Sequence, residues 1–437
     1  METDEPGGST ALRRSLDQPL RFEPLRIKKV GRDLVRRGDR RADKVSFTLS
    51  ADIQMHHQQS PVSANAPRRL CLFRLSAIGD CCNMVPIVRT LQAHLPETRL
   101  TWIMGQTEAG LLGDLDGVEV ITHDKKAGTG TLRRKLSGRA FDVLLLMQVA
   151  LRAGLVSRAV EAPVRIGFDR SRSRDGHSIF INQRIPNAPP GHVIDGFFGF
   201  CEALGVQARH LRWDIPVPNS AGEQAEHLLT EFFGGTSATG DDRTAARGIL
   251  LISPCSSQRF RNFRNWAPEY YAEVARYAAS VHGLRIILTG GKSEVERDYG
   301  EQITAALKNP LGQNAPVPVL NLIGRTDLKT LFALMQRASV VLAPDSGPLH
   351  MAVAAGTPAV GLYATSNPER TGPVLGMRWV VNAYPQAVRQ SLGRSVGDVR
   401  WGQRVRDPRA MALIKPAAVI AKLDELMSTP SKDRLAV

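Results

Sequence analysis

The stretch from Val340 to Ala364, VVLAPDSGPLHMAVAAGTPAVGLYA, most constrains the fold of this 437-residue chain. Its apolar and polar runs predict a buried strand at Val340–Ala343, a tight polar turn, a short helix and a second buried strand at Ala359–Tyr363. A helix that begins at the carboxyl end of a parallel strand directs unpaired N–H groups and its positive dipole end into the adjoining crevice. The stretch therefore predicts a site that attracts anions.

The polar turn within this stretch has the composition of a phosphate cradle. Asp345 or Ser346 is able to cap the helix, and Gly347 has no side chain that would keep an anion away. His350 adds a further hydrogen-bond donor one turn into the helix. The alternative is an ordinary strand–turn–helix unit whose caps are only structural, and this segment alone does not decide between the two.

Strands and helices alternate on both sides of a weakly patterned region at residues 216–248, which predicts an α/β protein with two doubly wound, Rossmann-like domains facing a cleft. We expect an N-terminal domain at residues 70–240 and a C-terminal domain at residues 248–437. The expected strands are 70–75, 100–104, 118–121 and 141–147 in the first domain, and 249–253, 285–289, 319–322, 340–343 and 359–363 in the second. In the first domain we expect a helix that follows the segment 76–80 and runs to about His94. The expected helices of the second domain are 268–281, 293–307, 328–336 and 416–427.

The first 69 residues are polar and basic and show no sustained periodicity, so we expect a disordered basic extension. A short helix at Leu25–Arg37 is its only expected element, and the alternative is a solvated tail or a start codon assigned too early. The chain shows no apolar run near the ~18 residues that cross a bilayer, and we expect no secretory signal. These features favour a cytoplasmic location.

The five cysteines have no metal-ligand spacing, so we expect reduced thiols and no metal site. The formal net charge of +15 calls for an anionic partner such as nucleic acid, an anionic lipid surface or a phosphorylated substrate. An aromatic content of 6% and the absence of helix-turn-helix, zinc-finger or RNP patterns argue against nucleic acid. A basic nucleic-acid-binding protein remains the alternative from another functional class.

Basic runs in the expected loops of the first domain predict a rim that binds an anionic acceptor. Any single run is more often a solvated face, but three of them in one domain favour an anion-binding rim. The candidate residues are Lys125, Lys126, Arg133, Arg134, Arg165, Arg170, Arg172 and Arg174.

The turn after the first strand of the second domain, SPCSSQRFRNFRNW, carries two adjacent hydroxyls and three arginines, a set that suits a diphosphate. The chain has neither a dinucleotide fingerprint nor a P-loop. Gly290-Gly291 instead offers a turn that a nucleotide can approach closely, and Glu294 or Glu296 is able to accept hydrogen bonds from ribose. Both glutamates are otherwise ordinary helix-surface residues, and Trp266 is expected to anchor a helix by packing.

Four motifs in order resemble the lipopolysaccharide heptosyltransferases, glycosyltransferase family nine. They are RLSAIGD from Arg74, SPCSSQRFRNFRNW from Ser253, LTGG from Leu288 and APDSGPLHMAVAAGTPAVGLY from Ala343. The resemblance runs from about Leu70 to the C-terminus. The stretch Arg139–Asp169 further resembles the branch that adds the first heptose to Kdo.

The resemblance implies a GT-B fold with an acceptor-binding first domain, an ADP-heptose-binding second domain and a C-terminal helix that often crosses back. It implies inverting transfer to Kdo-lipid A without a metal or other cofactor, and a catalytic aspartate at Asp80. The alternative for Asp80 is a helix cap. The implied diphosphate contacts are Ser256, Ser257, Asp345, Ser346, Gly347 and His350.

The phosphate loop departs from the family pattern, since an arginine stands where members have lysine and the loop is longer. It is therefore open whether Arg264 or Arg261 neutralises the leaving group. On this reading Asp80 and the cradle meet only when the cleft closes. The enzyme would attach peripherally to the anionic inner face of the inner membrane. A GT-B enzyme with another donor or acceptor is the nearest alternative, and the sequence leaves open the heptose isomer, its position, the acceptor's decoration and the oligomeric state.

Overall fold

The computed structural model describes residues 66–234, 248–256, 263–308 and 315–435. The expected helix at Leu25–Arg37 and nearly all of the basic extension lie outside these residues.

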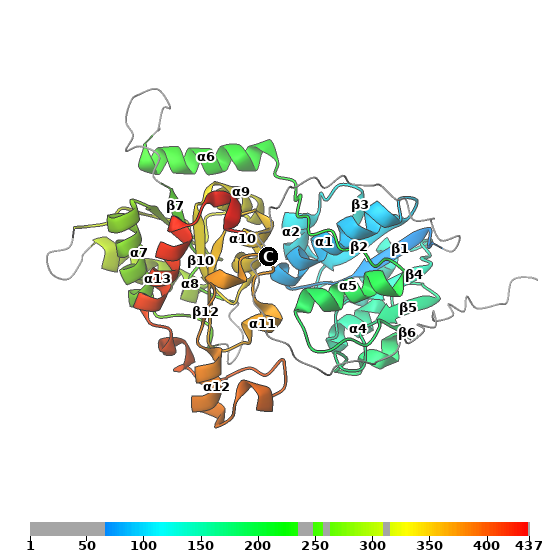
Figure 1. The fold of residues 1–437 in the computed structure, drawn as a ribbon. Helices are drawn as coiled ribbons and strands as arrows, with labels where there is room; N and C mark the ends of the chain where they lie inside the picture. Colours follow the sequence, from blue (N-terminus) through cyan, green and yellow to red (C-terminus); the bar gives the residue numbers. More distant parts are fainter. Residues whose placement is uncertain (1–65, 235–247, 257–262, 309–314, 436–437) are drawn as a thin grey trace, which may run out of the picture. The chain divides into compact units, whose positions relative to one another are not determined.

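The first domain contains a six-stranded parallel sheet with the strand order β3-β2-β1-β4-β5-β6 (Figure 1). Its central strands are buried on both faces, as expected for a parallel sheet covered by helices. The strands are β1 (Arg69–Phe73), β2 (Arg99–Gly105), β3 (Val118–His123), β4 (Val143–Leu146), β5 (Val164–Gly167) and β6 (Gln183–Arg184). The helices are α1 (Ile78–His94), α2 (Gln106–Leu112), α3 (Gly128–Lys135), α4 (Leu151–Ser157) and α5 (Val193–Ala203).

The second domain contains a six-stranded parallel sheet with the order β12-β11-β10-β7-β8-β9. The strands are β7 (Ile249–Ile252), β8 (Arg285–Leu288), β9 (Val319–Asn321), β10 (Val340–Pro344), β11 (Ala359–Tyr363) and β12 (Val381–Asn382). The helices are α7 (Pro268–His282), α8 (Glu294–Lys308), α9 (Leu328–Arg337), α10 (Gly347–Ala354), α11 (Pro368–Thr371), α12 (Tyr384–Leu392) and α13 (Pro416–Ser428). The prediction of two doubly wound parallel sheets is confirmed.

The weakly patterned region at residues 216–248 contains a helix that the sequence analysis did not predict, α6 (Asn219–Phe233). It packs against α9 of the second domain, and Thr330 and Arg337 of α9 hydrogen-bond to Gln224 and Glu226 of α6. Only three side chains of α6 are buried, which explains the weak apolar signal.

The structure tests two expectations about packing in the second domain, one for Trp266 and one for the last helix. Trp266 is completely buried against Tyr270 and Tyr271 and donates a hydrogen bond from Nε1 to the Ile414 carbonyl at 3.0 Å, so its anchoring role is confirmed. The last helix, α13, packs on α7, β11 and β12 of its own domain. This packing differs from the expected crossing back to the first domain.

The two domains meet closely where α1 of the first packs against α10 of the second. A Cβ atom added at Gly79 would lie 2.6 Å from Cδ2 of His350, and one added at Gly347 would collide with Cγ2 of Ile78. Both helices begin at the carboxyl ends of central strands, β1 and β10. The glycines therefore let the two helix starts touch, and the expectation that Asp80 and the cradle meet only on closure of the cleft stays a prediction.

We predict that Gly79→Ala lowers the free energy of unfolding by about 1–3 kcal/mol, because the new methyl group overpacks the contact with the buried His350 ring. Gly110→Ala is the matched control, since Gly110 also lies in a helix but has nothing within 4 Å of an added Cβ. The control is expected to be neutral or to stabilise by up to about 1 kcal/mol. Denaturant unfolding followed by circular dichroism measures both, and an equal response of the two variants would contradict the close approach.

Candidate functional site

Asp80 lies in the first turn of α1 and is held there by a buried arginine. Arg74, at the end of β1, forms an ion pair with Asp80 Oδ2 and donates a second hydrogen bond to the Met147 carbonyl. Its guanidinium also lies over the Phe197 ring, 4.9 Å from the centroid. The Asp80 side chain stays 35% exposed while that of Arg74 is 10% exposed, so the carboxylate is fixed on one side and accessible on the other.

The start of α10 is organised by a second arginine–carboxylate pair. Arg264 donates to the Asp345 carbonyl at 2.7 Å and to its carboxylate at 3.1 Å, and both side chains are largely buried. The Ser366 hydroxyl donates to the same carboxylate at 2.6 Å. Asp345 is thus used to hold the loop and Arg264 together, which keeps a cation at the helix start.

Two buried polar groups in the cradle have no hydrogen-bond partner within the described part of the chain. They are Oγ of Ser346, which is the N-cap residue of α10 but makes no cap hydrogen bond, and Nδ1 of His350. Burial lowers the pKa of His350, against the opposing influence of Asp345 and Asp80, so its imidazole is neutral at pH 7. Polar groups that are buried without a partner are costly, and a ligand that enters the cradle would satisfy them.

The phosphate loop is only partly described. Ser256 is buried, and its N–H and hydroxyl both donate to Oδ1 of Asn265, at 2.9 and 3.2 Å. Ser257 and Arg261 lie outside the described residues. Of the two arginines considered for the leaving group, Arg264 is the one that the structure describes next to α10.

The turn after β8 donates hydrogen bonds to Glu296, a residue in the first turn of α8. Glu296 accepts from Gly291 N–H at 2.7 Å and from the Ser293 hydroxyl at 2.6 Å, so it caps the start of α8. Gly290 packs closely on Ile323, where an added Cβ would lie 3.3 Å from Cγ1. Glu294 is exposed at the first residue of α8, which leaves it the freer of the two candidate ribose acceptors.

Six of the eight rim cations are exposed. Lys125 and Lys126 follow β3, whereas Arg170 and Arg174 follow β5, so both pairs extend from the carboxyl edge of the sheet where Asp80 also lies. Arg133 and Arg134 lie on α3, where a loop was expected. The runs after β3 and β5 therefore flank the candidate site from two sides of β1.

The other two rim candidates are engaged inside the domain. Arg165 lies on β5 and donates to the carbonyls of Phe180, Val160 and Ser157 at 2.8–3.0 Å. Arg172 forms an ion pair with the fully buried Asp169. Their guanidinium groups stabilise loops around β5, unlike those of Arg170 and Arg174.

Two arginines near the site were missed as site residues by the sequence analysis. Arg74 lies within the RLSAIGD motif but was not singled out, although an arginine six residues before the aspartate was a usable signal. Arg370 lies on α11, which is not among the expected helices. No sequence pattern singled this residue out.

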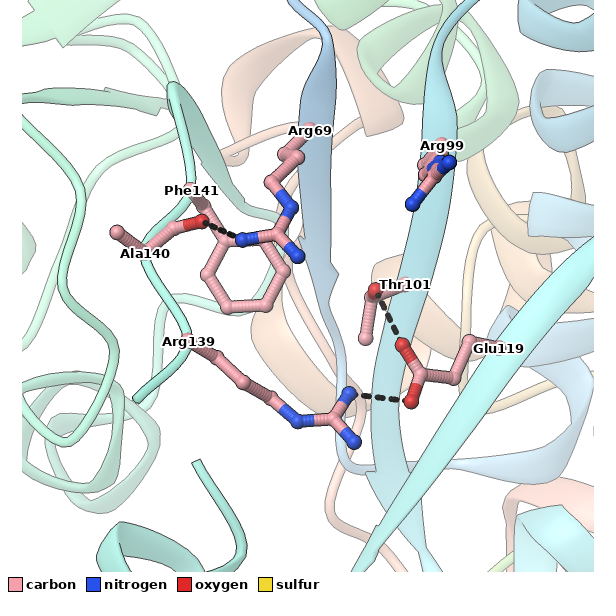
Figure 2. Close-up of a pocket in the computed structure, with 7 residues that line it drawn as sticks. All are labelled: Arg69, Arg99, Thr101, Glu119, Arg139, Ala140 and Phe141. Carbon is pink, nitrogen blue, oxygen red and sulfur yellow. Dashed lines mark hydrogen bonds and ion pairs between the residues drawn. The ribbon is translucent and has the colours of Figure 1, made fainter. Parts of the chain in front are cut away.

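A hollow of about 350 Å³ lies at the opposite edge of the first sheet (Figure 2). Arg69 and Arg99 are the first residues of β1 and β2, and Arg139 pairs with Glu119 across the opening (Figure 2). The hollow is therefore separate from the carboxyl-edge site.

The described residues also show the state of the cysteines, the grouping of possible metal ligands and the character of the helices. All five cysteines are buried free thiols. Within the described ranges no cluster of three or more His, Cys, Asp or Glu residues could hold a metal ion. None of the described helices is both long and apolar enough to span a membrane.

The sequence matches known heptosyltransferases over most of its length. The model of glycosyltransferase family 9 (heptosyltransferase) matches residues 129–391. The lipopolysaccharide core heptosyltransferase OpsX of Haemophilus influenzae is 36% identical over 369 residues, which are 84% of this chain and 99% of the relative. Lipopolysaccharide heptosyltransferase 2 of Escherichia coli is 30% identical over 68% of this chain and 83% of the relative.

Solved structures share the fold. A family 9 glycosyl transferase from Veillonella parvula superimposes with a TM-score of 0.61 at 19% identity, over 82% of this chain and 96% of that one. The E. coli heptosyltransferase WaaC with ADP gives a TM-score of 0.57 at 18% identity, over 82% and 98%. The expected GT-B fold is confirmed by these likenesses and by the two six-stranded parallel sheets. The chain belongs to glycosyltransferase family 9 and is a heptosyltransferase.

Proposed function

We propose that this heptosyltransferase transfers heptose from ADP-heptose to a Kdo-bearing lipid A acceptor in lipopolysaccharide inner-core synthesis, with inversion and without a metal. The observation that carries the proposal is the contact of two helix starts, one with the Asp80 carboxylate and the other with the amide-lined cradle of α10. The name of OpsX, a lipopolysaccharide core heptosyltransferase, supports a lipopolysaccharide precursor as the acceptor. The structure of WaaC with ADP supports an ADP-sugar as the donor.

The cradle suits the leaving group. The first N–H groups of α10 have no partner within the helix, and they carry its positive dipole end. Neutral His350, the Ser346 hydroxyl and the Arg264 guanidinium add donors next to them. As the bond from the anomeric carbon to the diphosphate oxygen breaks, its electron pair moves onto ADP, where these groups stabilise the charge without reorganising.

Asp80 suits the role of base. The acceptor hydroxyl attacks the anomeric carbon from the face opposite ADP, forms the new glycosidic bond and gives its proton to the Asp80 carboxylate. A single displacement of this kind inverts the sugar carbon. Arg74 would hold the carboxylate in line for the attack, because their ion pair fixes one side of the Asp80 side chain.

The first prediction concerns the substrates. Incubation with ADP-heptose and Kdo-bearing lipid A should release one ADP for each acceptor consumed, and lipid A without Kdo should release none. Free ADP should inhibit at concentrations where UDP and GDP do not. Equal inhibition by UDP would instead indicate a GT-B enzyme with another donor, and transfer to lipid A without Kdo would indicate another acceptor.

The second prediction concerns the base. Asp80→Asn should lower kcat by about 10²- to 10⁴-fold, because the amide cannot accept the proton, while ADP binding measured by calorimetry stays unchanged. Asp116→Asn is the control, since Asp116 is exposed in the same domain. Near wild-type turnover by a folded Asp80→Asn enzyme would refute the assignment.

We also propose peripheral attachment to the cytoplasmic face of the inner membrane, supported by the exposed cations after β3 and β5. Each cation near an anionic surface contributes about 1 kcal/mol, and salt screens the attraction. The enzyme should therefore sediment with anionic vesicles at low salt and be released at high salt.

Each of the two matched variants for this test reverses the charge of two exposed lysines. Lys125→Glu with Lys126→Glu should weaken sedimentation, whereas Lys308→Glu with Lys432→Glu, in the second domain, should not. Equal losses in the two double variants would contradict a membrane-facing rim on the first domain.

A further inference from the structure

The outer face of α4 carries two leucines where a surface helix ordinarily carries polar residues. The exposed residues of this helix and its C-cap are Leu151, Arg152, Leu155 and Arg158, and each leucine is 51% exposed. Surface helices of globular proteins turn their apolar side toward the core and their polar side toward solvent. The two leucines therefore lie outside the core that the buried residues of α4 help to form.

A third exposed apolar residue comes from the segment that packs on α4. Ile179 belongs to the one-turn 3₁₀ helix η1 (His177–Phe180) and is 76% exposed. The next residue, Phe180, is buried against α4, where a Cβ added at Gly154 would collide with its ring. The contact of Phe180 with Gly154 thus fixes η1 on α4 and leaves Ile179 on the outside.

The three exposed side chains lie next to one another. A Cβ added at Gly176 would lie 3.4 Å from Cδ1 of Ile179 and 4.0 Å from Cδ1 of Leu151, so these two side chains reach the same point of the surface. Leu151 and Leu155 are neighbours one turn apart on α4. Single exposed apolar residues are ordinary, but adjoining ones mark an interaction surface. We call Leu151, Leu155 and Ile179 the apolar patch.

The segments around the apolar patch carry mainly positive charge. Arg152 of α4 donates from Nη2 to the Lys125 carbonyl at 2.6 Å, so the basic run after β3 adjoins the helix. The exposed cations of these segments are Lys125, Lys126, Arg152, Arg158, Arg170 and Arg174, whereas the exposed carboxylates of residues 151–161 and 170–180 are Glu161 and Asp175. The surroundings of the patch therefore suit an anionic partner.

Hydrogen bonds place the start of α4 close to the turn that leads to Asp80. Gln148 lies between β4 and α4, and its Oε1 accepts from the Leu75 N–H at 2.8 Å. Arg74, which forms an ion pair with Asp80, also donates to the carbonyl of Met147. The patch and the proposed base thus extend from the same edge of the first sheet.

We infer that the apolar patch inserts into the acyl layer of an anionic lipid leaflet while the cations around it contact the headgroups. This assignment rests on the proposed membrane attachment and adds the surface that enters the bilayer. An apolar side chain gains free energy when it leaves water for the acyl region, and neighbouring cations gain from anionic headgroups. Insertion of α4 would place the turn that carries Asp80 near the headgroups, where the sugar of a lipid-anchored acceptor lies.

A second copy of the chain is a less suitable partner for the patch. In a two-fold contact, each patch would lie on the same patch of the other copy. The cations of the two copies would then face one another, and like charges repel most strongly where water is excluded. An anionic leaflet instead supplies apolar chains for the patch and negative charge for the cations.

The binding test removes apolar surface and leaves every charge in place. Leu155→Gln with Ile179→Gln should lower the partition coefficient for vesicles of phosphatidylethanolamine and phosphatidylglycerol at low salt by about 10- to 100-fold, because two apolar side chains no longer leave water. Val281→Gln with Val295→Gln, which changes exposed valines of α7 and α8, is the matched control and should bind as wild type. Leu155→Phe with Ile179→Phe should retain tight binding. Wild-type binding by the first variant would overturn the assignment.

A fluorescent label reports insertion directly. The five native thiols are buried, so a thiol reagent should react selectively with the variant Ile179→Cys. An environment-sensitive label at this position should emit at shorter wavelength on the vesicles and be quenched by lipids that carry bromine on their acyl chains. The same label on Val281→Cys should show neither effect. Vesicle binding without quenching of the label on Ile179→Cys would overturn insertion.

Two acceptors separate this assignment from the proposed function. With a deacylated Kdo-bearing acceptor in solution, Leu155→Gln with Ile179→Gln should retain the wild-type kcat/KM, whereas with the acylated acceptor in anionic vesicles it should lose about 10-fold or more. An equal loss with both acceptors would overturn the assignment. Failure of the wild type to sediment with anionic vesicles would overturn the membrane attachment and this assignment with it. Failure of the wild type to transfer to either acceptor would instead overturn the proposed function and not the insertion.

Discussion

The site depends on the close contact between the starts of α1 and α10. Gly79 lies against the His350 ring, and Gly347 lies against Ile78, so side chains at either glycine would separate the helices. Each helix follows the carboxyl end of a central strand, which is where doubly wound sheets bind ligands. The contact therefore brings the carboxyl edges of the two sheets together, with Asp80 in the first turn of one helix and His350 in the other.

Buried arginines determine what each carboxylate near this contact is able to do. Asp345 accepts hydrogen bonds from Arg264 and Ser366, so its charge is used to hold the loop that precedes α10. Asp80 has one side fixed by Arg74 and the other accessible. The same pairing thus gives a structural carboxylate in the second domain and a carboxylate available for proton transfer in the first.

The sequence predicted the elements with strong apolar periodicity, and the second domain from β7 to β11 follows the expected ranges within a few residues. It missed β6 and β12, because two residues give too short a pattern to recognise. It also missed β5, whose four residues include Arg165 and are only half buried. Motifs identified the Asp80 turn and the Asp345 turn, since glycine and polar residues are required there by local geometry. Their direct contact was not predictable, because it depends on the relative position of two domains, which no local pattern encodes.

The arginines illustrate the same limit for charged residues. Arg165 and Arg174 occur in one basic run, yet Arg165 donates to three backbone carbonyls while Arg174 is 70% exposed. Arg370 belongs to no basic run, and burial lowers its pKa. The formal net charge of +15 therefore does not tell which cations face a ligand, because an arginine such as Arg165 is bound inside the domain.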